Sequence, residues 1–130
     1  MATVTTKLTL SSSDLTSQIL SLSLSKAITA SHTTGLARTK VGQTAVHANA
    51  AILYTADDYA ATAYIYIKNI DTTATNYVYV YNDTTTGDPV MLKLAGGEFA
   101  FLPTNADKTL RAYGTNATSV VEWMVFGVDQ

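Results

Sequence analysis

The 130-residue chain contains no cysteine, which excludes disulfide bridges and thiolate metal ligands. It has only two histidines, His32 and His47, and neither has a second ligand nearby at metal-binding spacing. We therefore interpret both as loop or surface residues and expect no metal site. No apolar run approaches the roughly 20 residues that cross a bilayer, and the first residues lack the pattern of a signal peptide.

Charge is also scarce, since Asp, Glu, Lys and Arg make up 14% of the residues and the net charge is −2. The eight Lys and Arg are scattered, so we expect no binding of nucleic acid through its phosphates. Thr, Ser, Asn and Ala take the place of the missing charges. Such a surface loses less side-chain entropy and hydration when a partner covers it. A neutral globular domain explains the same composition, and both interpretations stay open.

Local signatures of catalysis are missing: the sequence has no nucleophile elbow, no phosphate-binding glycine loop and no Ser/His/Asp pattern. Its aspartates mostly fall in predicted turns, where Asp bonds to its own backbone. These are Asp57, Asp58, Asp71, Asp83, Asp88 and Asp107. Calcium binding or a dispersed pair of hydrolase carboxylates is the alternative. We expect no enzyme and no cofactor, and we interpret Gly96-Gly97 as a turn before a strand.

Alternation of apolar and polar residues predicts seven to nine short strands, with turns about every 8–12 residues and no long helical pattern. The clearer strands are expected at residues 7–10, 18–26, 63–68, 77–81, 90–94, 98–102, 108–113 and 119–128. Residues 45–54 are rich in alanine, but their surroundings argue against a helix. The pattern is typical of an all-β, antiparallel β-sandwich of jelly-roll type. We expect a single domain in which residues 1–35 form N-terminal strands or an arm, and residues 36–130 form the sandwich core.

Two alternating segments, 63–68 and 77–81, are joined by a polar stretch and predict an antiparallel hairpin. One face of this hairpin would carry five tyrosines, the candidate interface: Tyr64, Tyr66, Tyr77, Tyr79 and Tyr81. The tyrosines could form a stabilising ladder, a protein interface or a platform for sugars. If they form an interface, Tyr77→Ala or Tyr79→Ala should weaken assembly more than folding. The predicted core consists of Ile65, Ile67, Val78, Val80, Leu92, Leu94, Val121, Trp123 and Val125.

Residues 64–69, 76–80 and 92–102, with the closing apolar segment 120–126, resemble small structural proteins of tailed bacteriophages. The resemblance covers roughly residues 60–128. It implies a capsid decoration (cement) protein, made in the host cytoplasm and held on the outer capsid surface of the virion. Its implied partners are the major capsid protein and copies of itself, as a homotrimer, with no nucleic acid and no membrane. The alternative is a carbohydrate-binding or host-recognition β-sandwich of a phage fibre or tail, with a glycan as ligand. The resemblance carries no functional residue over to this chain.

Overall fold

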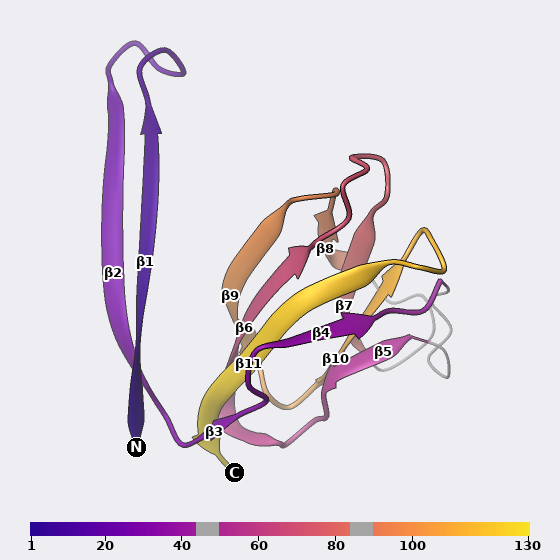
Figure 1. The fold of residues 1–130 in the computed structure, drawn as a ribbon. Coiled ribbons are helices and arrows are strands. Elements are labelled where there is room, and N and C mark those ends of the chain that lie inside the picture. Colours follow the sequence, from indigo (N-terminus) through magenta and orange to yellow (C-terminus); the bar gives the residue numbers. More distant parts are fainter. Residues whose placement is uncertain (44–49, 84–89) are drawn as a thin grey trace.

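The computed structural model describes residues 1–43, 50–83 and 90–130. These residues form eleven strands and no helix, and the strands are arranged in three sheets (Figure 1). The predicted all-β, antiparallel sandwich is confirmed. His47, Asp88 and Pro89 lie outside the described residues, as do half of the alanine-rich segment and most of the turn before residue 90.

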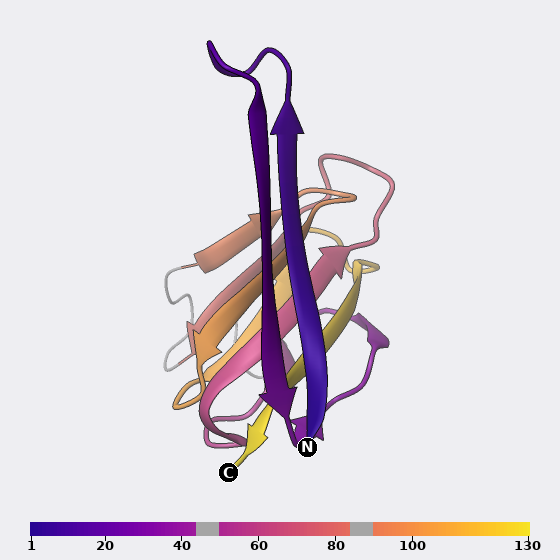
Figure 2. The same ribbon diagram turned by 90° about the vertical axis from the view of Figure 1, so that its left-hand side faces the viewer.

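The first two strands form a hairpin of their own. β1 (Ala2–Ser12) and β2 (Leu20–Ala30) pair antiparallel along their whole length, in one unbroken register. Figures 1 and 2 show this hairpin as a long ribbon beside the sandwich, with its far end projecting beyond it. We call residues 2–30 the arm. The chain then turns at Ser31 and enters the sandwich.

Two sheets packed face to face make up the sandwich. The first contains β3 (His32–Thr33), β4 (Ala37–Lys40), β11 (Val120–Asp129), β6 (Tyr59–Asn69) and β9 (Phe99–Asn105). The second contains, in spatial order, β5 (Ala51–Tyr54), β10 (Thr109–Gly114), β7 (Val78–Asp83) and β8 (Val90–Leu94). In the first sheet, β3 and β4 both pair with one edge of β11. The other edge of β11 pairs with β6, and β6 pairs with β9. Strands β4 to β11 thus form two four-stranded sheets, β4-β11-β6-β9 and β5-β10-β7-β8, and this is the strand order of a jelly roll.

The predicted hairpin between residues 63–68 and 77–81 is wrong. β6 pairs with β11 and β9, whereas β7 pairs with β10 and β8, so the two strands belong to opposite sheets. Alternation shows which side of a strand is buried, but it does not show which strand lies beside it. The polar segment between these strands therefore crosses from one sheet to the other.

The predicted core is confirmed, because it lies between the two sheets. Eight of the nine residues are buried, and Leu92 is half-buried against them. The apolar side chains of β6 and β7 meet across the sandwich, although these strands are not neighbours within a sheet. The sequence-based prediction missed several large members of the core, among them Leu53, Tyr54, Tyr59 and Leu110.

Two local predictions have different outcomes. The strand at 98–102 was expected to end at Pro103, but β9 continues to Asn105. It can do so because β9 lies at the edge of its sheet, where a residue without an N–H is tolerated. The Gly96-Gly97 turn is confirmed: the Glu98 N–H donates to the Ala95 carbonyl at 3.0 Å. Gly97 has a φ of 86°, which side chains disfavour.

Candidate interaction surface

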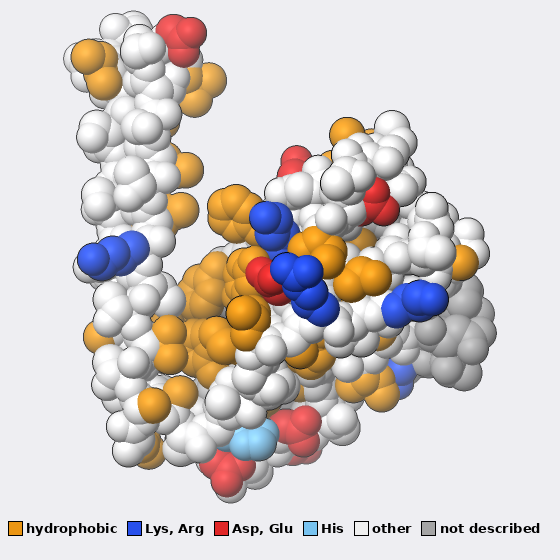
Figure 3. All heavy atoms as spheres, viewed as in Figure 1, with side chains coloured by type: hydrophobic (Ala, Val, Ile, Leu, Met, Phe, Trp, Pro, Cys, Tyr) orange, Lys and Arg blue, Asp and Glu red, His pale blue; other side chains and the backbone are white. Residues whose placement is uncertain are grey.

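The arm is polar on one face and apolar on the other. Cross-strand pairing places Leu8 opposite Leu24 and Leu10 opposite Leu22, so these four side chains share one side of the ribbon. Threonine, serine, lysine and alanine occupy the other side. We call the four leucines the leucine face. Each is 38% to 55% exposed, and Figure 3 shows apolar side chains along the edge of the arm that is turned toward the sandwich.

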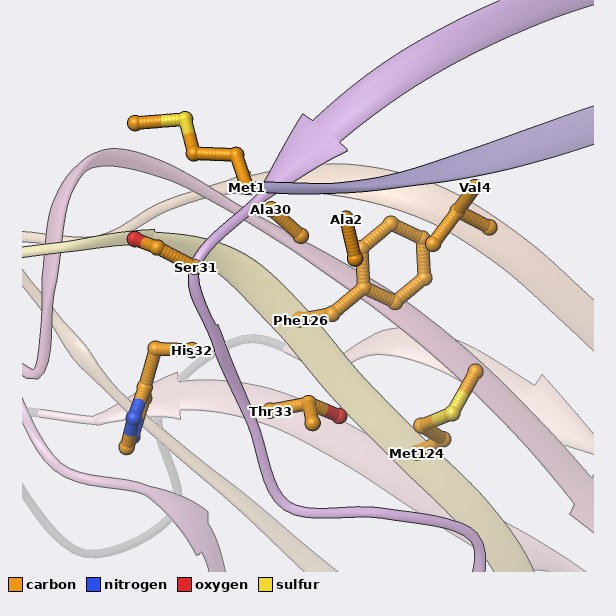
Figure 4. Close-up of a pocket in the computed structure, with 9 residues that line it drawn as sticks. All are labelled: Met1, Ala2, Val4, Ala30, Ser31, His32, Thr33, Met124 and Phe126. Atoms are coloured by element: carbon orange, nitrogen blue, oxygen red, sulfur yellow. The ribbon is translucent and has the colours of Figure 1, made fainter.

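The base of the arm is attached to the sandwich through the same face. Ile28 and Ala30 are buried with Phe126 of β11, and Val4 packs against this cluster. In Figure 4 the Phe126 ring lies beside Ala2 and Val4, at the edge of a hollow of about 490 Å³. Burial of these apolar side chains therefore holds the base against the outer face of the first sheet.

Phe126 belongs to an aromatic cluster that extends under the arm. The rings of Phe126, Tyr64 and Phe101 lie nearly parallel to one another, with centroids 5.7 to 6.3 Å apart. Phe126 is buried, but Phe101 is 41% exposed and Phe99, two residues earlier in β9, is 68% exposed. We call Phe99 and Phe101 the aromatic patch. It lies on the same outer face of the sheet as the base contact.

A groove of about 500 Å³ separates the arm from the aromatic patch. Leu8, Leu24 and Lys26 line it from the arm, and Phe99 and Phe101 line it from β9. Both walls thus present apolar side chains that nothing in the described part of the chain covers. The alternation at residues 7–10 and 18–26 predicted strands in this region. The aromatic patch was not predicted, and its signal in the sequence is two phenylalanines on one face of a strand that contains a proline.

A polar cluster borders the patch on the same sheet face. The Tyr66 hydroxyl donates to Glu122 Oε1 at 2.9 Å, and Arg38 lies 3.1 Å from Glu122 Oε2. These residues come from β6, β11 and β4. The hydrogen bond from Tyr66 and the contact with Arg38 lower the pKa of the Glu122 carboxyl below its ordinary 4.5.

We expect Tyr66→Phe to raise the pKa of Glu122 toward 4.5, because the hydrogen bond that favours the charged carboxylate is lost. A carboxyl with a depressed pKa stabilises the fold above its unfolded pKa, and this contribution disappears as the pH falls through the folded pKa. NMR titration of the Glu122 side-chain carbonyl measures the shift. Tyr79→Phe, in the other sheet, is the control and should leave the titration unchanged. An unchanged Glu122 midpoint in Tyr66→Phe would contradict the assignment.

The five candidate tyrosines do not share one face. Tyr64 and Tyr66 lie half-buried on the outside of the first sheet, whereas Tyr77 and Tyr79 lie half-buried on the outside of the second. Tyr81 is buried, with its ring 5.8 Å from that of Tyr113. The single tyrosine face is therefore wrong, for the same reason as the hairpin.

The second sheet carries a smaller tyrosine group. Tyr79 stacks on Tyr113 with centroids 5.1 Å apart, and Tyr77 follows at 6.4 Å from Tyr79. The Lys93 ammonium lies 4.2 Å from the centre of the Tyr77 ring. This group is a cross-strand ladder that leaves part of each ring accessible.

Two of the candidate aspartates, Asp58 and Asp71, accept hydrogen bonds within turns. Asp58 accepts the Thr55 N–H at 2.9 Å, and Asp71 accepts the Thr73 N–H at 2.8 Å. Hydrogen bonds from Thr73 and Asn76 lower the pKa of Asp71. Burial, followed by the negative charge of Asp58, raises the pKa of Tyr59 to about 12, so this phenol stays protonated at neutral pH. Among residues 1–43, 50–83 and 90–130, no three His, Asp or Glu come together as metal ligands.

No helix in the described part of the chain is long and apolar enough to cross a membrane. Compared with protein-family models, curated proteins and solved structures, the chain has no match.

Proposed function

We propose that the chain is a structural protein of a virion, a capsid decoration protein that stabilises the shell through protein–protein contacts. The observation that carries the proposal is the projecting arm with its uncovered leucine face. A two-stranded hairpin alone is marginally stable in water, and neither outer edge of this one pairs with another strand of the described residues. Such an element is stabilised when a partner covers it, which is the role of an arm in an assembly.

The low charge of the chain supports this role, because few charged side chains lose their hydration when two surfaces come into contact. The resemblance of residues 60–128 to phage structural proteins supports a capsid as the assembly. The partners are the major capsid protein and copies of the chain itself, as a trimer.

The test is the composition and reconstitution of particles. We expect mass spectrometry of gradient-purified virions to find the chain in a fixed ratio to the major capsid protein. Shells lacking the chain should bind the added purified protein, sediment with it and survive heating better. If the chain stays in the free fraction of the lysate, and added protein does not sediment with bare shells, the proposal is wrong.

The tyrosine group of the second sheet favours one alternative, a carbohydrate-binding module of a phage fibre or tail. Tyr77 and Tyr79 present partly accessible rings, and flat rings with polar tips suit stacking on sugars. A glycan array probed with the purified chain tests it. Binding that disappears in Tyr77→Ala would favour the alternative, and an array without signal would exclude it.

A further inference from the structure

The strongest unassigned feature is the pair of uncovered apolar walls that face the same groove. We propose that they are the two halves of one contact between copies: the leucine face of one copy covers the aromatic patch of a second copy. The proposal deepens the proposed function, on which it rests, by naming the partner of the arm.

Continuity with a contact inside the chain is the first argument. At the base of the arm, Val4 and Ile28 already pack on the aromatic cluster around Phe126. The leucine face continues that same side of the ribbon, and Phe101 continues the same ring cluster. Within one chain, the base of the arm packs on the aromatic cluster. In the proposed contact, the leucine face packs on the aromatic patch of a second copy in the same way.

The second argument is that the arm does not complete this contact within its own chain. Ser31 at its base is held to β11 at two points: its N–H donates to the Gly127 carbonyl, and its Oγ accepts the Asp129 N–H, each at 2.9 Å. From this attachment the arm runs beside the sandwich and past its end (Figures 1 and 2). The groove between the arm and the aromatic patch is still open at Leu8 and Lys26.

The third argument is that every copy carries both halves of the contact, since the four leucines and the two phenylalanines are each partly exposed in one chain. Every additional copy in a closed ring therefore adds another complete contact. A head-to-tail contact of this kind closes into a cyclic oligomer when the rotation between copies permits it. That geometry agrees with the trimer in the proposed function.

The absence of cysteine makes a direct test possible. Two single-cysteine variants, Leu8→Cys and Phe99→Cys, are mixed under mild oxidation, with the second labelled with ¹⁵N. We expect the intact mass to show a mixed disulfide dimer joining one labelled and one unlabelled chain. Since each chain has one cysteine, the product can form only between copies.

The matched control is Ser23→Cys, which lies on the polar face of the same arm. Mixed with Phe99→Cys, it should give at most about a tenth of the cross-linked product. Equal yields from both mixtures, or dimers of Leu8→Cys with itself alone, would overturn the proposal.

A second measurement follows self-association directly. Leu10→Ser with Leu22→Ser makes one cross-strand pair of the leucine face polar without touching the buried base. Light scattering should show self-association at least about tenfold weaker, with the urea midpoint of the sandwich unchanged. A wild-type chain that is monomeric at high concentration would overturn the copy contact. Binding of such a monomer to bare shells would leave the decoration function intact, so the two proposals fail separately.

Discussion

Asn69→Ala is expected to destabilise the fold by about 2–5 kcal/mol, because it leaves two backbone carbonyls without their donor at a buried position. Asn69 is 1% exposed, and its Nδ2 donates to the Asn76 carbonyl at 2.7 Å and to the Leu94 carbonyl at 3.0 Å. Its Oδ1 accepts the Asp71 N–H at 3.1 Å. One amide thus joins the end of β6, the crossover to β7 and the end of β8.

Urea unfolding monitored by tryptophan fluorescence measures this loss. Asn116→Ala is the matched control, because the Asn116 side-chain oxygen accepts its hydrogen bonds from Thr118 in an exposed turn. We expect the control to lose about 1 kcal/mol or less. If the two variants lose the same free energy of unfolding, the buried hydrogen bonds of Asn69 contribute no more to stability than those of an exposed turn.

Ile65→Ala should cost a similar amount, about 2–5 kcal/mol, through lost burial and the cavity that remains. Ile65 is fully buried in the middle of β6, with paired strands on both sides. Because the two neighbouring strands hold the backbone in place, the surrounding core cannot collapse into the space.

Ile52→Ala is the control for Ile65→Ala, since Ile52 lies in a strand of the other sheet and is 50% exposed. We expect it to lose under about 1 kcal/mol, measured by the same urea titration. A small loss in Ile65→Ala as well would mean that residues 63–68 are not central to the core.

These residues show how far sequence reasoning reaches in this protein. Ile65 was predicted in the core because alternation with Tyr64 and Tyr66 marks one side of the strand as buried. Asn69 was read only as part of a polar loop. Its role depends on carbonyls from two other segments, which no local pattern connects to it.

The tyrosines show the same limit of prediction from local sequence. Their alternation with Ile and Val marked the buried side of both strands, and the core assignment followed from it, although Tyr81 is buried rather than outward-facing. The conclusion that all five share a face required β6 and β7 to be sheet partners, and the chain places them in opposite sheets. A short polar segment can form a hairpin turn or a crossover, and local sequence does not distinguish them.

The alternation of leucine with serine in residues 20–25, and the similar pattern in residues 7–10, predicted amphipathic strands. Whether those strands enter the sandwich or stand apart was left open. Among the strands that the structure describes, β1 and β2 pair only with each other, and the hairpin is attached to the sandwich at Phe126, so they stand as an arm beside the two sheets.

The sequence by itself determined the all-β class, the buried side of β6, β7, β8 and β11, and the absence of disulfides, because period-two burial and residue types are local properties. Only the tertiary structure decided which strands pair, where the arm stands and which apolar residues remain uncovered. Those features depend on contacts between segments far apart in the chain. The leucine face and the aromatic patch, separated by 75 to 93 residues in the sequence, become a candidate surface only when the fold brings them to one groove.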